Sequence, residues 1–138
     1  MLHRFIIPSV PLIVSLFFAA ICIAAAQEAP KEPIVINVPA DATLKKPKVM
    51  FPHSAHAALQ CDACHHMLKD KPEVYSCITK GCHDLGNPKS SADRKSMTYF
   101  RNAFHANSKV SCNGCHKMLK KEGKPAGPTS CKECHTVK

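Results

Sequence analysis

Cys61-Asp62-Ala63-Cys64-His65-His66 is the stretch that decides the fold of this 138-residue chain. A Cys-x-x-Cys-His run is the attachment signature of a c-type haem: both thiols bond covalently to the haem, and the histidine binds its iron. His66 directly follows that signature and cannot serve the same haem. The stretch therefore predicts one covalent haem site with a further histidine beside it.

Three more runs end in Cys-His and follow at irregular intervals. They are Cys77-Ile78-Thr79-Lys80-Gly81-Cys82-His83, Cys112-Asn113-Gly114-Cys115-His116 and Cys131-Lys132-Glu133-Cys134-His135. In the second run four residues separate the thiols. One porphyrin can still bridge them if the inserted residues bulge outward, and Gly81 eases such a bulge.

Disulfides and zinc are the alternatives for so many cysteines in a small exported chain. Neither alternative requires a histidine immediately after every second cysteine, yet all four pairs have one. The adjacency therefore favours four covalently bound haem c groups. The eight thiols predicted to hold them are Cys61, Cys64, Cys77, Cys82, Cys112, Cys115, Cys131 and Cys134.

The histidine count predicts how the irons are ligated. Beyond the attachment runs and the N-terminal segment, four histidines remain: His53, His56, His66 and His105. Four irons with two axial ligands each need as many imidazoles as these and the four of the runs supply. We therefore predict bis-histidine ligation throughout, and low potentials, since methionine in place of histidine raises the potential of a haem.

Residues 1–26 have the pattern of a secretory signal peptide. A basic start at Arg4 precedes a long apolar run, which ends in Ala24-Ala25-Ala26. The alternative is an uncleaved membrane anchor, because the run is long enough to span a bilayer. The alanine-rich end favours cleavage, which predicts a periplasmic protein of residues 27–138.

The exported part is predicted to be a single domain that cannot stabilise itself by side-chain burial alone. Residues 27–138 contain only five aromatic side chains, namely Phe51, Tyr75, Tyr99, Phe100 and Phe104. Domains this small usually need disulfides, metals or another internal support. We therefore expect the four haems to fill the centre.

Few regular elements are expected. Residues 27–47 read as a surface-wrapping N-terminal arm with a strand signal at 34–38, for which 48–51 is a possible partner. Polar residues 84–98 are expected to form a loop, and apolar spacing predicts a helix over 97–108. The expected fold class is small, mainly α with much irregular structure and a short N-terminal β-hairpin.

The charge is uneven along the chain. Residues 109–138 carry seven basic and two acidic side chains, so a formal +5 surrounds the fourth attachment run. Such a basic segment is suited to docking an acidic redox partner. The alternative is that these lysines only solvate the surface, and export argues against nucleic acid as the partner.

Over about residues 47–138 the chain resembles the class III cytochromes c, the tetrahaem cytochromes c3 of anaerobic sulfate-respiring bacteria. The marks are Phe51-Pro52-His53-Ser54-Ala55-His56 before the first run, the four-residue spacer of the second, and Phe104-His105 before the third. The fourth run has a two-residue spacer, whereas four residues are commonest in the family.

By position, the resemblance implies which residues hold each haem. The first takes Cys61, Cys64, His65 and His53; the second Cys77, Cys82, His83 and His66; the third Cys112, Cys115, His116 and His56; the fourth Cys131, Cys134, His135 and His105. Residues 53–66 would then contact three haems. Neighbouring residues of a turn point in different directions, which is how His65 and His66 would reach two irons.

The resemblance also implies the function. The chain is expected to be a periplasmic electron carrier in sulfate respiration. A periplasmic hydrogenase would donate electrons, and membrane-associated or multihaem cytochromes would accept them at the basic 109–138 region. No small-molecule substrate is expected. The rival is a multihaem reductase, which needs an iron with a vacant or labile position, and the histidine count argues against it.

Overall fold

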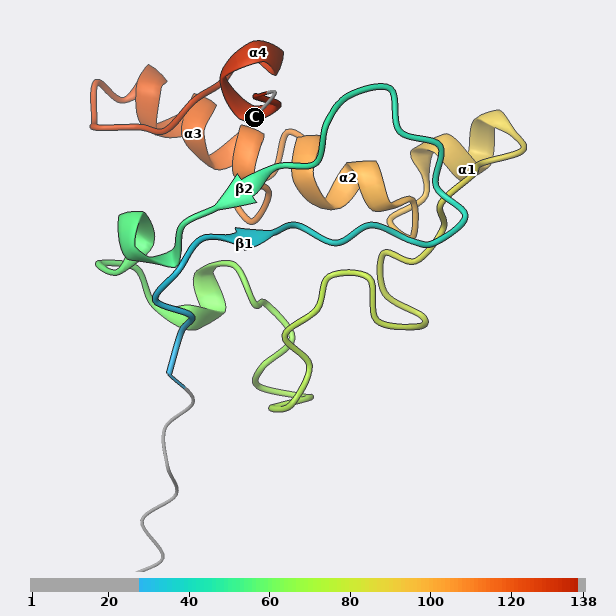
Figure 1. Ribbon diagram of the computed structural model, residues 1–138, viewed down its shortest axis with the longest axis horizontal. Helices are drawn as coiled ribbons and strands as arrows, with labels where there is room; N and C mark the ends of the chain where they lie inside the picture. The colour runs from blue at the N-terminus through green and yellow to red at the C-terminus, as the bar shows by residue number, and fades with distance from the viewer. Residues whose placement is uncertain (1–27, 137–138) are drawn as a thin grey trace, which may run out of the picture.

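The regular elements are short, and irregular segments join them (Figure 1). The computed structural model describes residues 28–136, so the predicted signal peptide, residues 1–26, lies outside the described residues. Within 28–136 no helix has the length and apolar character that crossing a membrane requires. The elements are β1 (Ile34–Val35), β2 (Met50–Phe51), the 3-10 turns η1 (His53–His56) and η2 (Cys61–Ala63), α1 (Ser91–Lys95), α2 (Phe100–His105), α3 (Cys112–Lys121) and α4 (Cys131–Cys134).

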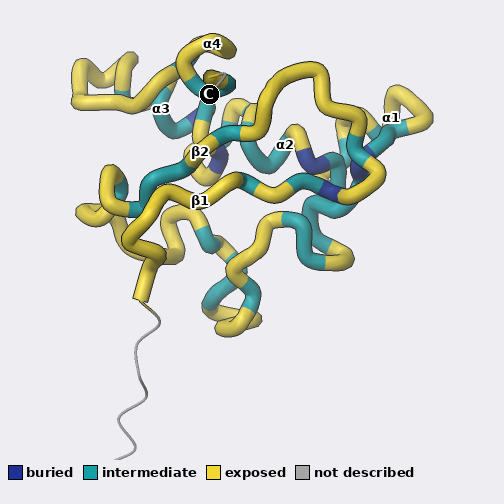
Figure 2. Tube along the Cα trace, in the orientation of Figure 1, coloured by how far each residue is buried: buried dark blue, intermediate teal, exposed yellow. Residues whose placement is uncertain are grey.

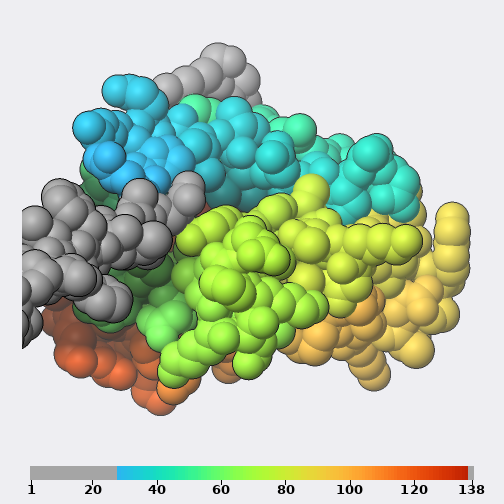
Figure 3. Space-filling view, turned by 90° about the horizontal axis from the view of Figure 1, so that it is seen from below, coloured from blue at the N-terminus to red at the C-terminus, as the bar shows by residue number. Residues whose placement is uncertain are grey.

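The N-terminal arm forms the predicted hairpin, with strands shorter than the alternating pattern suggested. β1 pairs antiparallel with β2, and Ile34 lies opposite Phe51. The Ile36 amide extends the ladder by donating to Val49 O at 2.9 Å. Most of the arm is exposed, and in the space-filling view it runs along one edge of the molecule (Figure 3).

The arm is also tied to the polar segment that follows the second attachment run. The Asn87 side-chain amide donates to Asp41 O, and its carbonyl oxygen accepts from the Thr43 amide at 3.3 Å. These bonds join parts of the chain more than forty residues apart. The arm is therefore positioned by both its strand pairing and this side chain.

The sequence prediction of a loop throughout 84–98 is wrong for Ser91–Lys95, which form α1. Ser90 and Asp93 make a capping box: Ser90 Oγ accepts from the Asp93 amide at 3.0 Å, and Asp93 Oδ2 accepts from the Ser90 amide at 2.9 Å. Hydrogen bonds from Ser90 and from the Lys89 amide hold the pKa of the Asp93 carboxyl below its usual value. This reciprocal cap satisfies amides that the helix itself leaves unpaired.

The helix predicted over 97–108 is confirmed over a narrower range, as α2, which packs against α3. Ser111 ends the connection between them and caps α3, since its Oγ accepts from the Gly114 amide at 3.1 Å. Gly114 lies so close to the Ser108 backbone that a Cβ would come within 2.5 Å of Ser108 N. The third attachment run therefore starts a helix that is held tightly against the preceding loop.

Side chains alone do not build a core. Phe100, at 6% exposure, is the only large apolar side chain that is buried among the described residues. Figure 2 shows dark blue at a few scattered positions and exposed or half-buried chain elsewhere. Natural interiors are close-packed, so an interior this open agrees with the expectation that haems fill the centre. The fold class is confirmed: helices provide most of the regular structure, with one short hairpin and much irregular chain.

Candidate haem sites

The structure brings the eight predicted histidine ligands together as four facing pairs. They are the same pairs that the family resemblance implied. The distances between ring centres are 6.5 Å for His53 and His65, 6.0 Å for His66 and His83, 6.1 Å for His56 and His116, and 6.1 Å for His105 and His135.

These separations fit one metal ion between each pair. An imidazole nitrogen binds a metal such as zinc at about 2 Å, so two imidazoles on opposite sides of one ion have centres roughly 6 Å apart. Each pair includes a histidine that directly follows a cysteine of an attachment run. The side chains therefore fit four haems with histidine on both faces, and iron ligation itself stays a prediction.

Five of the histidines are oriented by backbone carbonyls. Nδ1 of His56 lies 3.1 Å from Pro52 O, that of His105 3.1 Å from Arg101 O, that of His116 2.8 Å from Pro128 O and that of His135 2.7 Å from Pro47 O, while Nδ1 of His83 contacts Met97 O. A carbonyl oxygen can only accept, so Nδ1 carries the proton and Nε2 keeps its lone pair. This arrangement fixes the tautomer and ring orientation that metal-binding histidines need.

His53 and His65, the pair at the first site, lie in less polar surroundings than these five histidines. His53 Nδ1 is buried and has no hydrogen-bond partner. Burial is the main cause that lowers the pKa of His65, and the nearby His53 adds to it. Burial likewise lowers the pKa of His105 in the fourth pair. A lowered pKa favours the neutral imidazole, which is the form that binds iron.

Phe51 contacts histidines of two different pairs. Its ring lies edge-on to His53, with centres 4.9 Å apart, and stacks on His56 at 4.6 Å. The sequence did not predict this contact of Phe51 with the histidines. The close spacing of Phe51, His53 and His56 along the chain is the signal that could have indicated this contact.

The four thiol pairs lie beside these histidines and are free among the described residues. Desolvation of the sulfur is the main cause that raises the pKa of the Cys112 thiol to about 11, although the residue as a whole keeps an exposed surface. Burial also raises the pKa of the Cys64, Cys77 and Cys134 thiols. A desolvated environment of this kind suits the uncharged thioether sulfur that haem attachment would form. Residues 28–136 contain no group of three or more His, Cys, Asp or Glu side chains that could hold a metal ion by themselves.

The wide spacer of the second run is accommodated as predicted. Gly81 has φ +81°, a left-handed conformation that glycine adopts without steric cost. The His83 amide donates to Cys77 O at 3.0 Å, which closes the loop, and Asp84 Oδ2 accepts from the Gly81 amide at 3.0 Å. The inserted residues therefore form a closed loop that leaves Cys82 and His83 beside the cavity.

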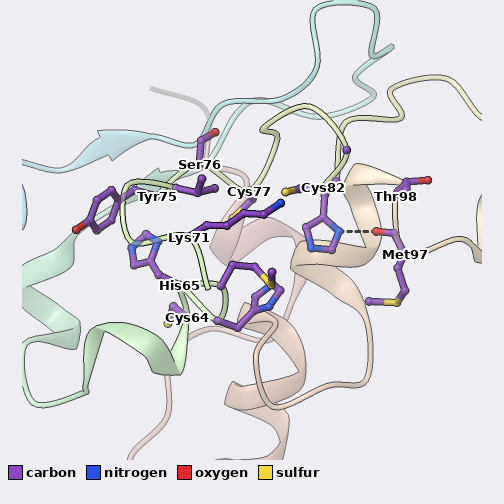
Figure 4. Close-up of a pocket in the computed structure, with 14 residues that line it drawn as sticks. Cys64, His65, Lys71, Tyr75, Ser76, Cys77, Cys82, Met97 and Thr98 are labelled. Atoms are coloured by element: carbon purple, nitrogen blue, oxygen red, sulfur yellow. Dashed lines mark hydrogen bonds between the residues drawn. The ribbon is translucent and has the colours of Figure 1, made fainter. Parts of the chain in front are cut away.

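A cavity of about 280 Å³ lies between the first and second sites (Figure 4). Cys77 and Cys82 border it, and His83 bonds to the Met97 carbonyl across from them. His65 and Tyr75 stand at the opposite side, with their ring centres 5.4 Å apart. The cavity is the opening in which the second haem would be held.

The second pair is expected to have its own EPR signature. Its imidazole planes make an angle of 64°, whereas the other three pairs are within 17° of parallel. Strongly inclined imidazoles bring two iron d orbitals close in energy, which raises the largest g value of a low-spin ferric haem. Low-temperature EPR of the oxidised protein should show one component with a larger maximum g value than the rest. Four equivalent signals would contradict the inclined geometry.

Gly127 is expected to be essential for the third site. A Cβ there would lie 2.6 Å from Nε2 and 2.9 Å from Nδ1 of His116, so Gly127→Ala should displace that imidazole. We expect one haem in four to lose an axial ligand and to bind carbon monoxide when reduced, as measured by the visible spectrum. Gly123→Asn is the matched control, because Gly123 has open space around it and asparagine tolerates its left-handed φ. Full six-coordination in Gly127→Ala would show that the contact is unimportant.

Comparisons with known proteins show the family and the fold. Residues 30–135 match the class III cytochrome c family. A cytochrome c3 of Maridesulfovibrio salexigens is 45% identical over 105 residues, which are 76% of this chain and 93% of the relative. A 26 kDa cytochrome c3 of Desulfomicrobium norvegicum is 37% identical over 95 residues, 67% of this chain and 81% of that protein. The crystal structure of the di-tetraheme cytochrome c3 from Desulfovibrio gigas superposes with a TM-score of 0.65 at 30% identity, covering 79% of this chain and 98% of the other.

Proposed function

The chain belongs to the class III cytochrome c family of haem-based electron-transfer proteins. We therefore propose that it carries four bis-histidine haems in the periplasm. It passes electrons between a periplasmic hydrogenase and membrane-associated or multihaem cytochromes in sulfate respiration. It is a carrier and acts on no substrate of its own.

The four facing histidine pairs support this proposal most directly. The rings of each pair are spaced so that both could bind one iron, which would leave no position for a substrate. When bound, a haem supplies an iron that takes up one electron and later releases it. The chain's part is to orient the imidazoles, through bonds such as His116 Nδ1 to Pro128 O.

The proposal is tested by intact mass and a potentiometric titration of protein made in a host that matures c-type cytochromes. We expect the mass of residues 27–138 plus four haems, which also reports cleavage of the signal peptide. The titration should show low-potential, low-spin transitions for every haem. Fewer haems, or a high-potential component, would contradict it.

We place the docking surface at the basic end of the molecule. Lysines of α3 and of the segment after it are exposed, and the fourth site's α4 lies at the same end (Figure 1). Lys120, Lys124 and Glu133 line a hollow there. Lys124 Nζ pairs with Glu122 at 2.7 Å, while Lys120 makes no ion pair among the described residues. Unpaired surface lysines of this kind steer an acidic partner and speed its encounter at low salt.

Reversing two of these charges should slow reduction by hydrogenase. The double variant Lys120→Glu with Lys121→Glu is expected to lower the rate at low ionic strength by about tenfold or more, and added salt should narrow the difference. Stopped-flow reduction measures both effects. The matched control reverses Lys89 and Lys95, beside and within α1, and should leave the rate nearly unchanged. An equal effect in both variants would indicate general charge attraction and no defined docking surface.

A further inference from the structure

We propose that Lys71 raises the reduction potential of the second haem by holding its ammonium group against that haem. The inference rests on the proposed function, because it takes the haem to lie between His66 and His83. It goes further in assigning one side chain a defined effect on one of four sites.

Lys71 stands out among the residues around the second site. Of the side chains that line the cavity of about 280 Å³ between the first two sites, it is the only Lys, Arg, Asp or Glu. Figure 4 shows Lys71 extended across the middle of the cavity, with its nitrogen toward Cys82. Met67, Val74 and Met97, which also line the cavity, are uncharged side chains.

The position of Lys71 is set by its backbone. Its amide donates to Met67 O at 2.8 Å, and its carbonyl accepts from the Val74 amide at 3.0 Å. Two successive turns therefore fix the point from which the side chain starts. The stem then lies over the cavity, an arrangement common for lysine, whose methylene groups cover apolar surface.

No carboxylate of residues 28–136 forms an ion pair with this ammonium group. Within residues 28–136 the ion pairs are Lys31 with Glu28 and Lys124 with Glu122, and neither involves Lys71. A cation that lies beside a ligand cavity and has no acidic partner among the described residues is suited to the anionic propionates that a haem carries. Lys71 is thus a positioning and tuning residue for the second haem.

The direction of the effect follows from charge. One-electron reduction, with the electron taken from an electrode, lowers the positive charge at the iron by one. A fixed cation nearby disfavours the more positive ferric state and therefore raises the potential. Lys71 keeps an exposed surface, so solvent and salt weaken its effect.

The test compares Lys71→Met with Lys71→Arg in the intact four-haem protein. Haem-resolved NMR during a redox titration measures each midpoint potential separately. Lys71→Met should shift the second haem to a lower potential, by more than any other haem, while Lys71→Arg should stay close to the unaltered protein. Lys69→Met is the matched control: Lys69 is exposed, lies two residues away and does not line the cavity.

The outcomes separate this proposal from the one on which it rests. The role of Lys71 would be overturned if Lys71→Met carried four haems and the potential of the second haem did not shift specifically. It would also be overturned if Lys71→Met and Lys69→Met shifted that potential equally. Either result would leave the electron-carrier proposal intact. Absence of a bis-histidine haem at His66 and His83 in the unaltered protein would overturn the proposed function itself. If Lys71→Met incorporates fewer haems, Lys71→Gln provides the same removal of charge in a more polar side chain, and the same shift is required of it.

Discussion

Without haem, residues 27–138 are expected to be unfolded. The reason is the missing core, since Phe100 is the only large apolar side chain that is buried among the described residues. Apolar burial is the main favourable contribution to folding, and conformational entropy opposes it with a similar size. A chain that buries so little cannot offset the cost of ordering its backbone.

This expectation is tested by producing residues 27–138 in a cytoplasm, where c-type haem is not attached. Circular dichroism should show a disordered chain, and urea should produce no cooperative transition. The haem-loaded protein, as the matched control, should unfold cooperatively. A cooperative transition in the haem-free chain would mean that side chains alone specify the fold.

His66→Met is expected to raise the potential of the second haem. Methionine in place of histidine favours ferrous iron, and axial ligands span a range of roughly 0.8 V across haem proteins. The ring of His66 faces that of His83 at 6.0 Å. His65 faces His53 instead, so the first haem should change little.

Haem-resolved redox titration measures this effect, and EPR provides an independent reading. The component with the largest g value, assigned to the inclined pair, should disappear in His66→Met while the other three remain. If the first haem alone responded, the pairing of His66 with His83 would be wrong.

The number of sites and the attachment residues could be predicted from sequence because they are local patterns. Cys61 to His66 contain a complete attachment signature, and the count of histidines predicts bis-histidine coordination. The pairing of the histidines could be predicted only from the family resemblance, because the two members of a pair such as His56 and His116 lie sixty residues apart in the sequence. No spacing along a chain encodes such a contact.

Other features of the sites depend on the folded chain. The carbonyl that orients His135 belongs to Pro47, 88 residues away in the N-terminal arm. The 64° angle of the second pair likewise has no signal in sequence. In contrast, α1 could have been predicted from the sequence, because Ser90 and Asp93 have the spacing of a capping box. The polar residues around them led instead to the prediction of a loop.

Residues 53–66 are the centre of this arrangement. The rings of His53, His56, His65 and His66 lie within one short segment, and they face partners that belong to three different pairs. The histidine beside the first signature is therefore half of the second pair. One segment thus fixes the relative positions of three sites, as electron passage between them requires.

The most direct test of bis-histidine ligation at every iron is the visible spectrum of the fully reduced four-haem protein before and after carbon monoxide is added. Carbon monoxide needs a vacant or labile axial position. With both axial positions of each iron taken by a histidine pair, the spectrum should not change. A shift of the Soret band in the native protein would reveal an open iron and contradict the account of a pure electron carrier.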